Sequence, residues 1–457
     1  MGSRKPIRYL SAFLGMAAMA SLAAIPLSGV TATAAAAATT GRAVPALIGK
    51  EGKPLYTKTS GPHAGLFSCQ APQSATNPVP CYGPSQIRHA YVVPNNLTGR
   101  GQTIAIIDAF GNPYIASDLA QFDATFGLPA AHLNIICVAS ATSTGPCPTF
   151  DITNADQVDW AGEIALDTQW AHAIAPGATI DLVISKSDQD ADILAAQQYT
   201  INNNLGDVLS QSFGEWETCL QSETSIFNAT LAAFQAAQAE NMSVFASAGD
   251  QGAAVFNCAG TGFVKGVNMP ASDPLVTSVG GTHLNANFLT GTYQSESVWN
   301  NSGQNPDFGA TGGGFSTIFS RPSYQNRAAT GSVFRGVPDV TYNGDVYGGV
   351  LAVCSACNGG TAAFFIFGGT SAGSPQWAAI TSLADQAAGH RLGFLNPTLY
   401  DFAASAFYAS IFHDITVGNN SWDVSGVTGY FAHRYWDPTS GLGSPYAISL
   451  IHLLAAS

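Results

Sequence analysis

Short apolar segments alternate with longer helical ones between residues 103 and 247, and this pattern constrains the fold more than any other feature. The predicted strands are 103–107, 179–184, 208–212 and 243–247, and the predicted helices are 114–126, 158–175, 188–203 and 223–240. Such alternation indicates a parallel sheet covered by helices on both faces. The sequence therefore predicts an α/β fold. Since no linker divides the later part of the chain, we expect one large domain over residues 84–457.

The beginning of the chain is typical of a secretory signal peptide. Three basic residues among the first eight precede a mostly apolar run over residues 10–25, and small residues follow. We predict that residues 1–38 are a signal peptide and that residues 39–83 form an extended arm, so that the protein is secreted. No later segment offers the roughly 20 uninterrupted apolar residues that a membrane helix needs.

The net charge is acidic, at -13 for the whole chain. Removal of the predicted leader takes away three positive charges and no negative one, which gives -13 - 3 = -16. An acidic surface argues against a nucleic-acid partner. It also suits an acid environment, where carboxylates become protonated. We expect a monomer without a nucleic-acid or membrane partner.

Eight cysteines in a chain predicted to be secreted indicate disulfides. Proximity along the chain favours four pairs among the many that are possible: Cys69–Cys81, Cys137–Cys147, Cys219–Cys258 and Cys354–Cys357. The last pair has the C-x-x-C spacing that also occurs in metal and redox sites. Because the chain has no second such pair, we interpret it as a small structural disulfide.

A glycine-rich octapeptide at residues 368–375 is the first candidate for a catalytic centre. Its Ser371 stands between a predicted buried strand over 361–367 and a predicted helix over 376–388. Glycines allow a tight turn and a close approach of substrate, and a helix N-terminus directs N–H groups toward the hydroxyl. A fold can present a nucleophile in this way and stabilise the oxyanion that it creates. From the octapeptide alone, a serine that only caps the helix is an equal alternative.

Two carboxylates on the predicted helix 158–175 form the second candidate. Glu163 and Asp167 are four residues apart, which places them on one helix face at about 6 Å. Two carboxylates this close do not ionise independently, so one pKa is expected to be raised. Such a group serves as base toward a serine and then as acid toward a leaving amine. The alternative is a solvated acidic face, although the neighbouring Trp160 and Trp170 favour a packed helix.

The third candidate is Asp250, which follows the predicted strand 243–247 in a glycine-containing turn. Ligands of open α/β sheets bind beyond the C-terminal ends of the strands. A protonated Asp250 would donate a hydrogen bond to an oxyanion there. Alternatively, it caps its own turn. Residues 210–214 and 312–316 also contain glycine and either offer backbone to a bound peptide or are plain loops.

Together these residues resemble the sedolisins, or serine-carboxyl peptidases, which share the subtilisin fold. The motifs, in order, are E-x-x-x-D at 163–167, H-A-I-A-P-G-A at 172–178, S-A-G-D-x-G at 247–252, G-V-P-D-V at 336–340 and G-G-T-S-A-x-x-P at 368–375. The resemblance runs from about Cys81 to the C-terminus. It implies that Ser371 is the nucleophile, Glu163 the general base, Asp167 the carboxylate that orients it, and Asp250 the oxyanion-hole acid.

The resemblance also implies one calcium ion near the C-terminus. Asp414 and Asp437 would give side-chain oxygens, and Ile415, His433 and Tyr435 their carbonyls. The last two positions are commonly glycine in the family, which leaves the geometry of this loop open. Oxygen ligands of this mixture suit calcium rather than zinc. From the residues alone, without the resemblance, we would interpret the two aspartates as turn residues.

The chain departs from the family at its N-terminus. Family members often carry a large folded propeptide, whereas only the predicted arm lies between the predicted leader and the domain. Inhibition by a folded prodomain is therefore not expected.

A Ser-His-Asp triad of the subtilisin type is the first alternative. Asp108 ends the first predicted strand where the subtilisin aspartate would lie. That triad also needs a histidine that opens a helix in an H-G-T setting, which the chain lacks, and His172 lies at the far end of its helix. The second alternative is a non-catalytic secreted binding protein on the same fold. We expect a secreted, acid-active endopeptidase of proteins or peptides, with tripeptide release from N-termini left open.

Overall fold

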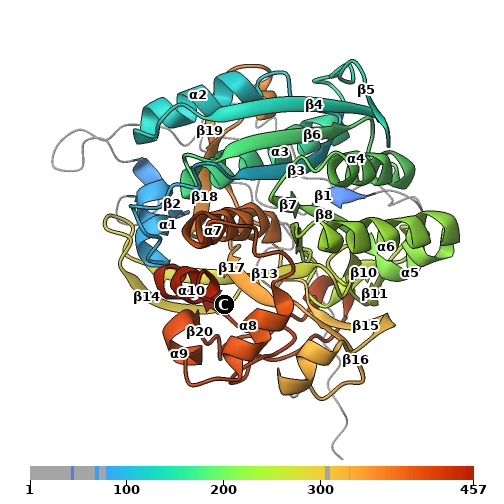
Figure 1. Cartoon of the computed structure of the whole chain (residues 1–457), viewed down its shortest axis with the longest axis vertical. Coiled ribbons are helices and arrows are strands. Elements are labelled where there is room, and N and C mark those ends of the chain that lie inside the picture. Colours follow the sequence, from blue (N-terminus) through green and yellow to red (C-terminus); the bar gives the residue numbers. More distant parts are fainter. Residues whose placement is uncertain (1–42, 46–66, 71–78, 304–308, 329) are drawn as a thin grey trace, which may run out of the picture.

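A large, mostly parallel sheet runs through the molecule (Figure 1). The computed structural model describes residues 43–45, 67–70, 79–303, 309–328 and 330–457, so the predicted signal peptide and most of the predicted arm lie outside the described residues. The strand order is β14-β13-β9-β7-β3-β6-β4-β5, with β17 beside β13. The pairs β13–β14 and β4–β5 are antiparallel, and the other pairs are parallel. The strands are β3 (Thr103–Ala109), β4 (His132–Ser140), β5 (Ser143–Thr144), β6 (Thr179–Ser185), β7 (Val208–Gln211), β9 (Ser243–Ser247), β13 (Thr277–Ala286), β14 (Tyr293–Val298) and β17 (Val340–Asn343).

Helices cover both faces of this sheet, as the sequence predicts. One face carries α2 (Ile115–Phe126), α3 (Ala155–Ile174) and α7 (Gly373–Ala388), with α1 (Pro84–Ala90) and α10 (Ala447–Leu454) beside them; the other carries α4 (Asp190–Asn202) and α6 (Thr224–Ala239). In Figure 1 the label of α7 is left of the central strands, and those of α4 and α6 are to their right. Along β3, Ile104 and Ile106 join the core on one face, whereas Ala105 and Ile107 join the core on the other. The predicted α/β fold is therefore confirmed. None of the helices in the described ranges is both long and apolar enough to span a membrane.

Shorter elements surround the sheet and were mostly not predicted. They are β1 (Val44–Pro45), β2 (Cys81–Tyr82), β8 (Phe213–Trp216), α5 (Glu217–Ser222), β10 (Ala254–Phe256), β11 (Phe263–Lys265), β12 (Asn268–Met269), β15 (Gly314–Ser320), β16 (Phe334–Val337), β18 (Gly349–Val353), β19 (Phe364–Phe367), α8 (Asn396–Ala403), α9 (Tyr408–Ile411), β20 (Phe412–His413) and β21 (Ser444–Pro445). Among them, β8 continues directly from β7 of the large sheet and forms a separate three-stranded sheet with β1 and β12.

Strand β13 shows why one central strand was missed. It contains Gly280 and Gly281, a pair that by itself indicates a turn. A side chain at Gly280 would come within 2.8 Å of Pro338, and one at Gly281 within 2.6 Å of Trp299. The glycines therefore allow close packing inside a strand, which local sequence patterns do not distinguish from a turn.

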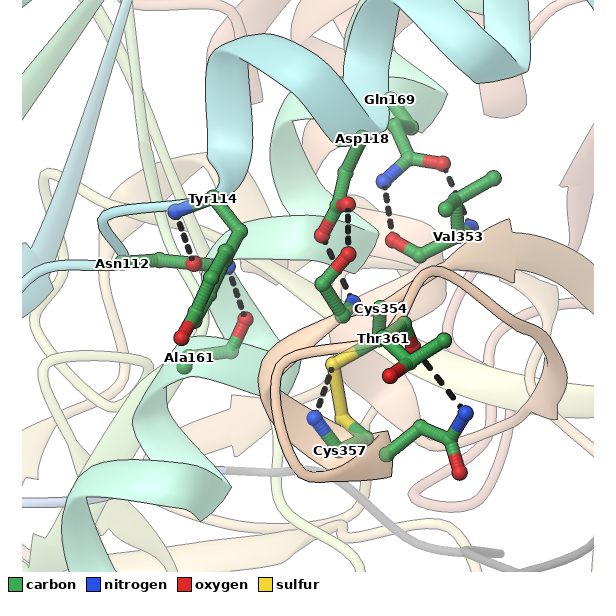
Figure 2. The surroundings of a disulfide bond; sticks show 11 residues. Asn112, Tyr114, Asp118, Ala161, Gln169, Val353, Cys354, Cys357 and Thr361 are labelled. Carbon is green, nitrogen blue, oxygen red and sulfur yellow. Dashed lines mark hydrogen bonds between the residues drawn. A yellow bond between two sulfur atoms is a disulfide. The ribbon is translucent and has the colours of Figure 1, made fainter. Parts of the chain in front are cut away.

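Side-chain hydrogen bonds join α3 to β18 and to the segment that follows β3 (Figure 2). Gln169 donates from Nε2 to the Val353 carbonyl at 2.7 Å and accepts from the Val353 N–H at 2.8 Å. Asn112 donates to the Ala161 carbonyl at 3.1 Å, near the start of the segment that carries Glu163 and Asp167. These bonds fix the helix that carries both candidate carboxylates.

The loop that follows Val353 is closed by a disulfide between Cys354 and Cys357 (Figure 2). Ser355 of this loop donates its N–H to Asp118 of α2 at 2.8 Å. The other bridges are Cys69–Cys81, Cys137–Cys147 and Cys219–Cys258. All four predicted pairings are confirmed, and the alternative of a metal site at the C-x-x-C segment is excluded.

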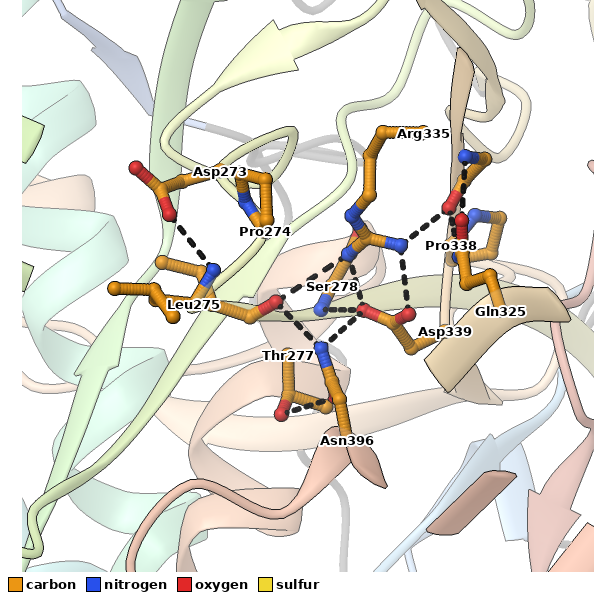
Figure 3. Close-up of polar contacts among 12 residues, drawn as sticks. Asp273, Pro274, Leu275, Thr277, Ser278, Gln325, Arg335, Pro338, Asp339 and Asn396 are labelled. Carbon is orange, nitrogen blue, oxygen red and sulfur yellow. Dashed lines mark hydrogen bonds and ion pairs between the residues drawn. The ribbon is translucent and has the colours of Figure 1, made fainter. Parts of the chain in front are cut away.

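A buried ion pair holds the G-V-P-D-V segment against the sheet (Figure 3). Arg335 and Asp339 are both fully buried, and Arg335 Nη1 lies 2.7 Å from Asp339 Oδ1. Asp339 also accepts hydrogen bonds from the N–H of Ser278, at 2.9 Å, from Tyr400 and from Asn396. The carboxylate therefore links β13, β17 and α8.

Candidate active site

The fold brings the four candidate catalytic residues to one buried place. Glu163 and Asp167 come from α3, Asp250 from the loop after β9, and Ser371 from the turn that leads into α7. These four residues are 0–1% exposed. Ser371, Asp167 and Asp250 lie near enough to Glu163 to affect its pKa, and α3 packs against the turn that carries Ser371.

The backbone before Ser371 makes the tight turn that the glycines predict. Gly369 has a φ of 100°, and its N–H donates to the Gly344 carbonyl at 2.6 Å. The helix begins at Gly373, three residues before the predicted start, and Ala372 is its N-cap residue without a side-chain cap. The Ser371 hydroxyl donates to the Ser212 carbonyl at 3.4 Å. The alternative of a serine that caps the helix is therefore excluded.

Asp250 is oriented by the residue before Ser371. Its Oδ1 accepts the N–H of Thr370 at 2.8 Å and the Thr370 hydroxyl at 2.9 Å. Its Oδ2 is buried and has no hydrogen-bond partner among the described residues. Burial raises the pKa of Asp250 to about 7, against the lowering effect of the two bonds from Thr370. Since its bonds reach across 120 residues, Asp250 does not cap its own turn.

Glu163 and Asp167 form no solvated acidic face, because both are fully buried. Burial raises the pKa of Glu163 well above its usual value, and the charges of Asp167 and Asp108 raise it further. The hydroxyl of Ser371 lies close enough to oppose this rise, although it donates to Ser212 and not to the carboxylate. Burial likewise raises the pKa of Asp167 to about 8, against the effects of Ser212 and Glu163.

Asp108 is a third buried carboxylate, for which the sequence suggested the role of a subtilisin aspartate. It is fully buried near the end of β3, and burial together with the charge of Asp167 raises its pKa well above the usual range. None of the oxygens of Asp108, Asp167 and Glu163 makes a hydrogen bond of normal geometry to a described residue. The sequence feature that pointed to Asp108 was the position of a carboxylate near the end of a predicted apolar strand.

The histidine of the alternative Ser-His-Asp triad lies elsewhere. His172 Nε2 lies 2.9 Å from the Pro129 carbonyl and 3.2 Å from Asp123 Oδ1. In the described part of the chain, no histidine is among the groups that act on the pKa of Glu163, Asp167 or Asp250. An imidazole base for Ser371 therefore finds no support.

The two glycine-containing segments both lie next to this site. Within 312–316, the N–H of Gly312 donates to the Gly249 carbonyl at 2.6 Å, beside Asp250. Within 210–214, Ser212 accepts from Ser371, and β8 follows directly. One edge of β8 is paired with β1, with Val44 opposite Gly214. The backbone of β8 therefore pairs with an extended segment, and this segment is β1 of the same chain.

The predicted calcium ligands gather in two C-terminal loops. Asp437 is fully buried and accepts hydrogen bonds from the N–H groups of His433, at 3.1 Å, and Thr439, at 2.8 Å. Asp414 accepts the N–H of Tyr435 at 3.0 Å. Tyr435 has a φ of 65°, a conformation that favours glycine.

The donor chemistry of this region fits a hard cation. Ser440 joins its two loops, since its hydroxyl lies 3.1 Å from Asp437 and 3.5 Å from the Ile415 carbonyl. No ion pair with a basic side chain is found for Asp414 or Asp437 in the described ranges. The same ranges contain no group of three or more His, Cys, Asp or Glu side chains suited to a metal, so any ion here would need backbone carbonyls.

Comparisons with known proteins agree with this geometry. The chain is 36% identical over 408 residues to kumamolisin from Bacillus sp. strain MN-32, covering 86% of this chain and 66% of that protein. It is 31% identical over 378 residues to sedolisin from Pseudomonas sp. strain 101, covering 79% of this chain and 59% of that protein. The chain thus spans about two thirds or less of these curated relatives. No protein-family model matches it.

Among solved structures, the fold is similar to that of Pseudomonas sedolisin, a serine-carboxyl proteinase complexed with two molecules of pseudo-iodotyrostatin. The TM-score is 0.72 at 27% identity, and the match covers 83% of this chain and 99% of that chain.

Proposed function

Since this chain belongs to the sedolisin family of serine-carboxyl peptidases, we propose that it hydrolyses peptide bonds through Ser371, Glu163, Asp167 and Asp250. The observation that carries this proposal is a buried serine hydroxyl beside a cluster of carboxylates, with no imidazole of the described residues acting on them. All four positions are present, which argues against a non-catalytic binding protein on the same fold. The preferred substrates are internal bonds of proteins or peptides.

In the proposed mechanism, Ser371 Oγ attacks the carbonyl carbon of the scissile bond and Glu163 accepts its proton. Asp167 orients Glu163 and tunes its pKa. The oxyanion of the tetrahedral intermediate accepts hydrogen bonds from the Ser371 N–H and from the protonated Asp250. Glu163 then gives its proton to the leaving amine, and a water molecule hydrolyses the acyl-enzyme by the same route.

The base needs only one negative charge in the cluster of Asp108, Glu163 and Asp167. Burial opposes the first ionisation of this cluster, whereas repulsion between its carboxylates opposes only the later ones. Activity should therefore appear once the first proton has left. An imidazole base would lose activity below about pH 6. From the resemblance to the serine-carboxyl peptidases, we expect this protein to stay active below that pH. The raised pKa of Glu163 opposes this and sets the acid limit of the activity.

Asp250 sets the alkaline limit in this proposal. Its carboxyl group can donate a hydrogen bond only while it is protonated, below its pKa of about 7. We expect activity to fall as the pH rises through 7. In Asp250→Asn the amide keeps a donor at every pH, so this limb should move to higher pH. Asp250→Ala should lose about 10²–10³-fold in kcat at all pH values.

The measurement is the pH dependence of kcat on a fluorogenic peptide. Asp423→Asn, which changes an exposed aspartate outside the site, serves as the control and should leave the profile unchanged. An alkaline limb that is identical in wild type and Asp250→Asn would contradict the role of Asp250.

We also propose one calcium ion held by the side chains of Asp414 and Asp437 and by the carbonyls of Ile415, His433 and Tyr435. Calcium would join the two loops and bind only the folded chain. At free calcium 100-fold above Kd, such binding contributes about 2.7 kcal/mol to stability. Excess chelator should therefore lower the Tm of the wild type, and re-added calcium should restore it.

In Asp437→Asn, chelator should have little further effect on the Tm, which calorimetry or fluorescence measures. An equal response of wild type and variant would place the calcium elsewhere.

Secretion is proposed as well, because four disulfides are typical of oxidising compartments.

A further inference from the structure

Asp345 is a buried carboxylate that the proposed mechanism does not use. It follows β17 and is 3% exposed. Its Oδ2 lies 2.7 Å from His283 Nδ1, and its Oδ1 accepts hydrogen bonds from Asn301 Nδ2 at 2.5 Å and from the Tyr347 N–H at 2.8 Å. The Asp345 side chain therefore joins β13, the segment after β14 and the loop after β17.

The backbone beside Asp345 holds the turn before the proposed nucleophile. The N–H groups of Gly344 and Asp345 both donate to the Thr282 carbonyl, at 2.9 and 3.1 Å. The Gly344 carbonyl in turn accepts the N–H of Gly369 at 2.6 Å. Gly369 is two residues before Ser371, and β13 and β17 both pack against the helical turn that contains this serine. The position of the Gly344 carbonyl therefore affects that of Ser371.

These segments meet through backbone atoms, with no room for a side chain. A Cβ atom at Gly344 would lie 3.0 Å from the Gly281 Cα and 3.0 Å from the Gly369 carbonyl oxygen. A Cβ atom at Gly281 would lie 3.5 Å from Cγ2 of Thr370, the residue before Ser371. Because close-packed interiors transmit strain, a shift of the loop after β17 is passed on to the turn.

Asn301 connects the same carboxylate to the loop that carries Asp250. The N–H of Asn301 donates to the Gly309 carbonyl at 2.8 Å, and the N–H of the next residue, Ala310, donates to the Asp250 carbonyl at 3.0 Å. Asp345 is thus linked both to the turn before the nucleophile and to the loop of the proposed oxyanion-hole acid.

His283 is the half-buried end of this network. Its side chain is 40% exposed. The hydrogen bond with Asp345 raises the pKa of His283; burial opposes this rise, and the charges of Asp345 and Glu296 add to it. A protonated His283 donates to the carboxylate in a charge-assisted hydrogen bond, which is stronger than a neutral one.

We propose that Asp345, fixed by His283 and Asn301, is a positioning residue that sets the place of the Ser371 hydroxyl through the Gly344 carbonyl. The inference rests on the proposed function, because it takes Ser371 as the nucleophile. A misplacement of about 1 Å can cost an enzyme on the order of 10²-fold in rate. Loosening of this network should therefore lower kcat, whereas KM should change little.

The first test compares kcat and KM of wild type and Asp345→Asn on a fluorogenic peptide. An amide accepts hydrogen bonds at only one of its two ends, so the bond from His283 or from Asn301 is lost. We expect kcat to fall about tenfold and KM to stay within about twofold. Asp123→Asn is the matched control and should keep the wild-type kcat, because Asp123 is also buried and lies 3.2 Å from a histidine, His172, but belongs to α2. A wild-type kcat in folded Asp345→Asn overturns the proposal.

A second pair of variants serves in case Asp345→Asn does not fold. His283→Ala removes a half-buried side chain and leaves Asp345 its bonds from Asn301 and from the Tyr347 N–H. His283→Asn keeps an N–H donor near the position of Nδ1. We expect His283→Ala to lower kcat about fivefold and His283→Asn to recover most of this loss. A wild-type kcat in His283→Ala, or no recovery in His283→Asn, overturns the proposal.

Binding of a peptide aldehyde and of the matching peptide alcohol separates positioning from a general loss of structure. Ser371 Oγ adds to the aldehyde carbon, its proton passes to Glu163, and the carbonyl electron pair moves to the oxygen; the alcohol cannot react in this way. In Asp345→Asn, the Ki of the aldehyde should rise about tenfold and that of the alcohol should stay within about twofold. Equal changes in both overturn the proposal. A wild type that binds the aldehyde no more tightly than the alcohol contradicts the proposed function itself, and this inference with it.

Discussion

Replacement of Ser371 by alanine is expected to abolish peptide hydrolysis and to leave the fold intact. The hydroxyl is the only proposed nucleophile, and loss of such a group lowers kcat on the order of 10⁶-fold in enzymes of related chemistry. The structural cost is small, because the hydroxyl makes one long bond, of 3.4 Å, to the Ser212 carbonyl. A single neutral hydrogen bond contributes about 1 kcal/mol. The measurement is kcat on a fluorogenic peptide, with thermal unfolding in parallel.

Two further variants make this test specific. Ser410→Ala changes an exposed serine outside the site and should keep full activity. Glu163→Gln retains the shape of the proposed base but cannot take up the proton, so it should be nearly as inactive as Ser371→Ala. Near-native hydrolysis by a folded Ser371→Ala protein would refute the assignment of the nucleophile.

Replacement of Asp339 by alanine should cause a large loss of stability. It leaves the guanidinium of Arg335 fully buried without its carboxylate (Figure 3), and it removes the acceptor for Ser278, Asn396 and Tyr400. Breaking a buried ion pair on one side typically costs about 3–5 kcal/mol. Urea unfolding of the purified variant, compared with wild type, gives the difference in the free energy of unfolding.

The chain offers a matched ion pair at the surface. Arg327 and Asp401 are also in contact, but their side chains are 61% and 57% exposed. Asp401→Ala should therefore cost at most about 1 kcal/mol. If both aspartate variants lost the same stability, burial would not be the reason for the effect. Replacement of Arg335 and Asp339 together by apolar residues should recover part of the loss, because no buried charge then remains unpaired.

Much of the fold followed from local patterns. Strand β9 was predicted with its observed bounds, and β3, β6 and β7 and helices α2, α3, α4 and α6 within three residues at either end. Strand β4 was missed because it lies near the sheet edge with polar and exposed positions; Ile135, for example, is 46% exposed. The pairing of β1 with β8 was also missed, since two residues that pair with a strand about 170 positions later carry no local signal.

The sequence by itself determined the alternation of strands and helices, the order of the motifs and the identity of Ser371, Glu163, Asp167 and Asp250 as candidates. It favoured the four disulfide pairs through the proximity of their cysteines, but the pairing itself was decided by the structure. Periodicity, residue spacing and short motifs are local properties, and these inferences were made from them. Only the tertiary structure decided that the carboxylates are buried, that Asp250 is held by Thr370 and that Asp108 joins the cluster. Desolvation and hydrogen bonding depend on which distant segments meet, and those effects set the pKa values on which the proposed chemistry depends.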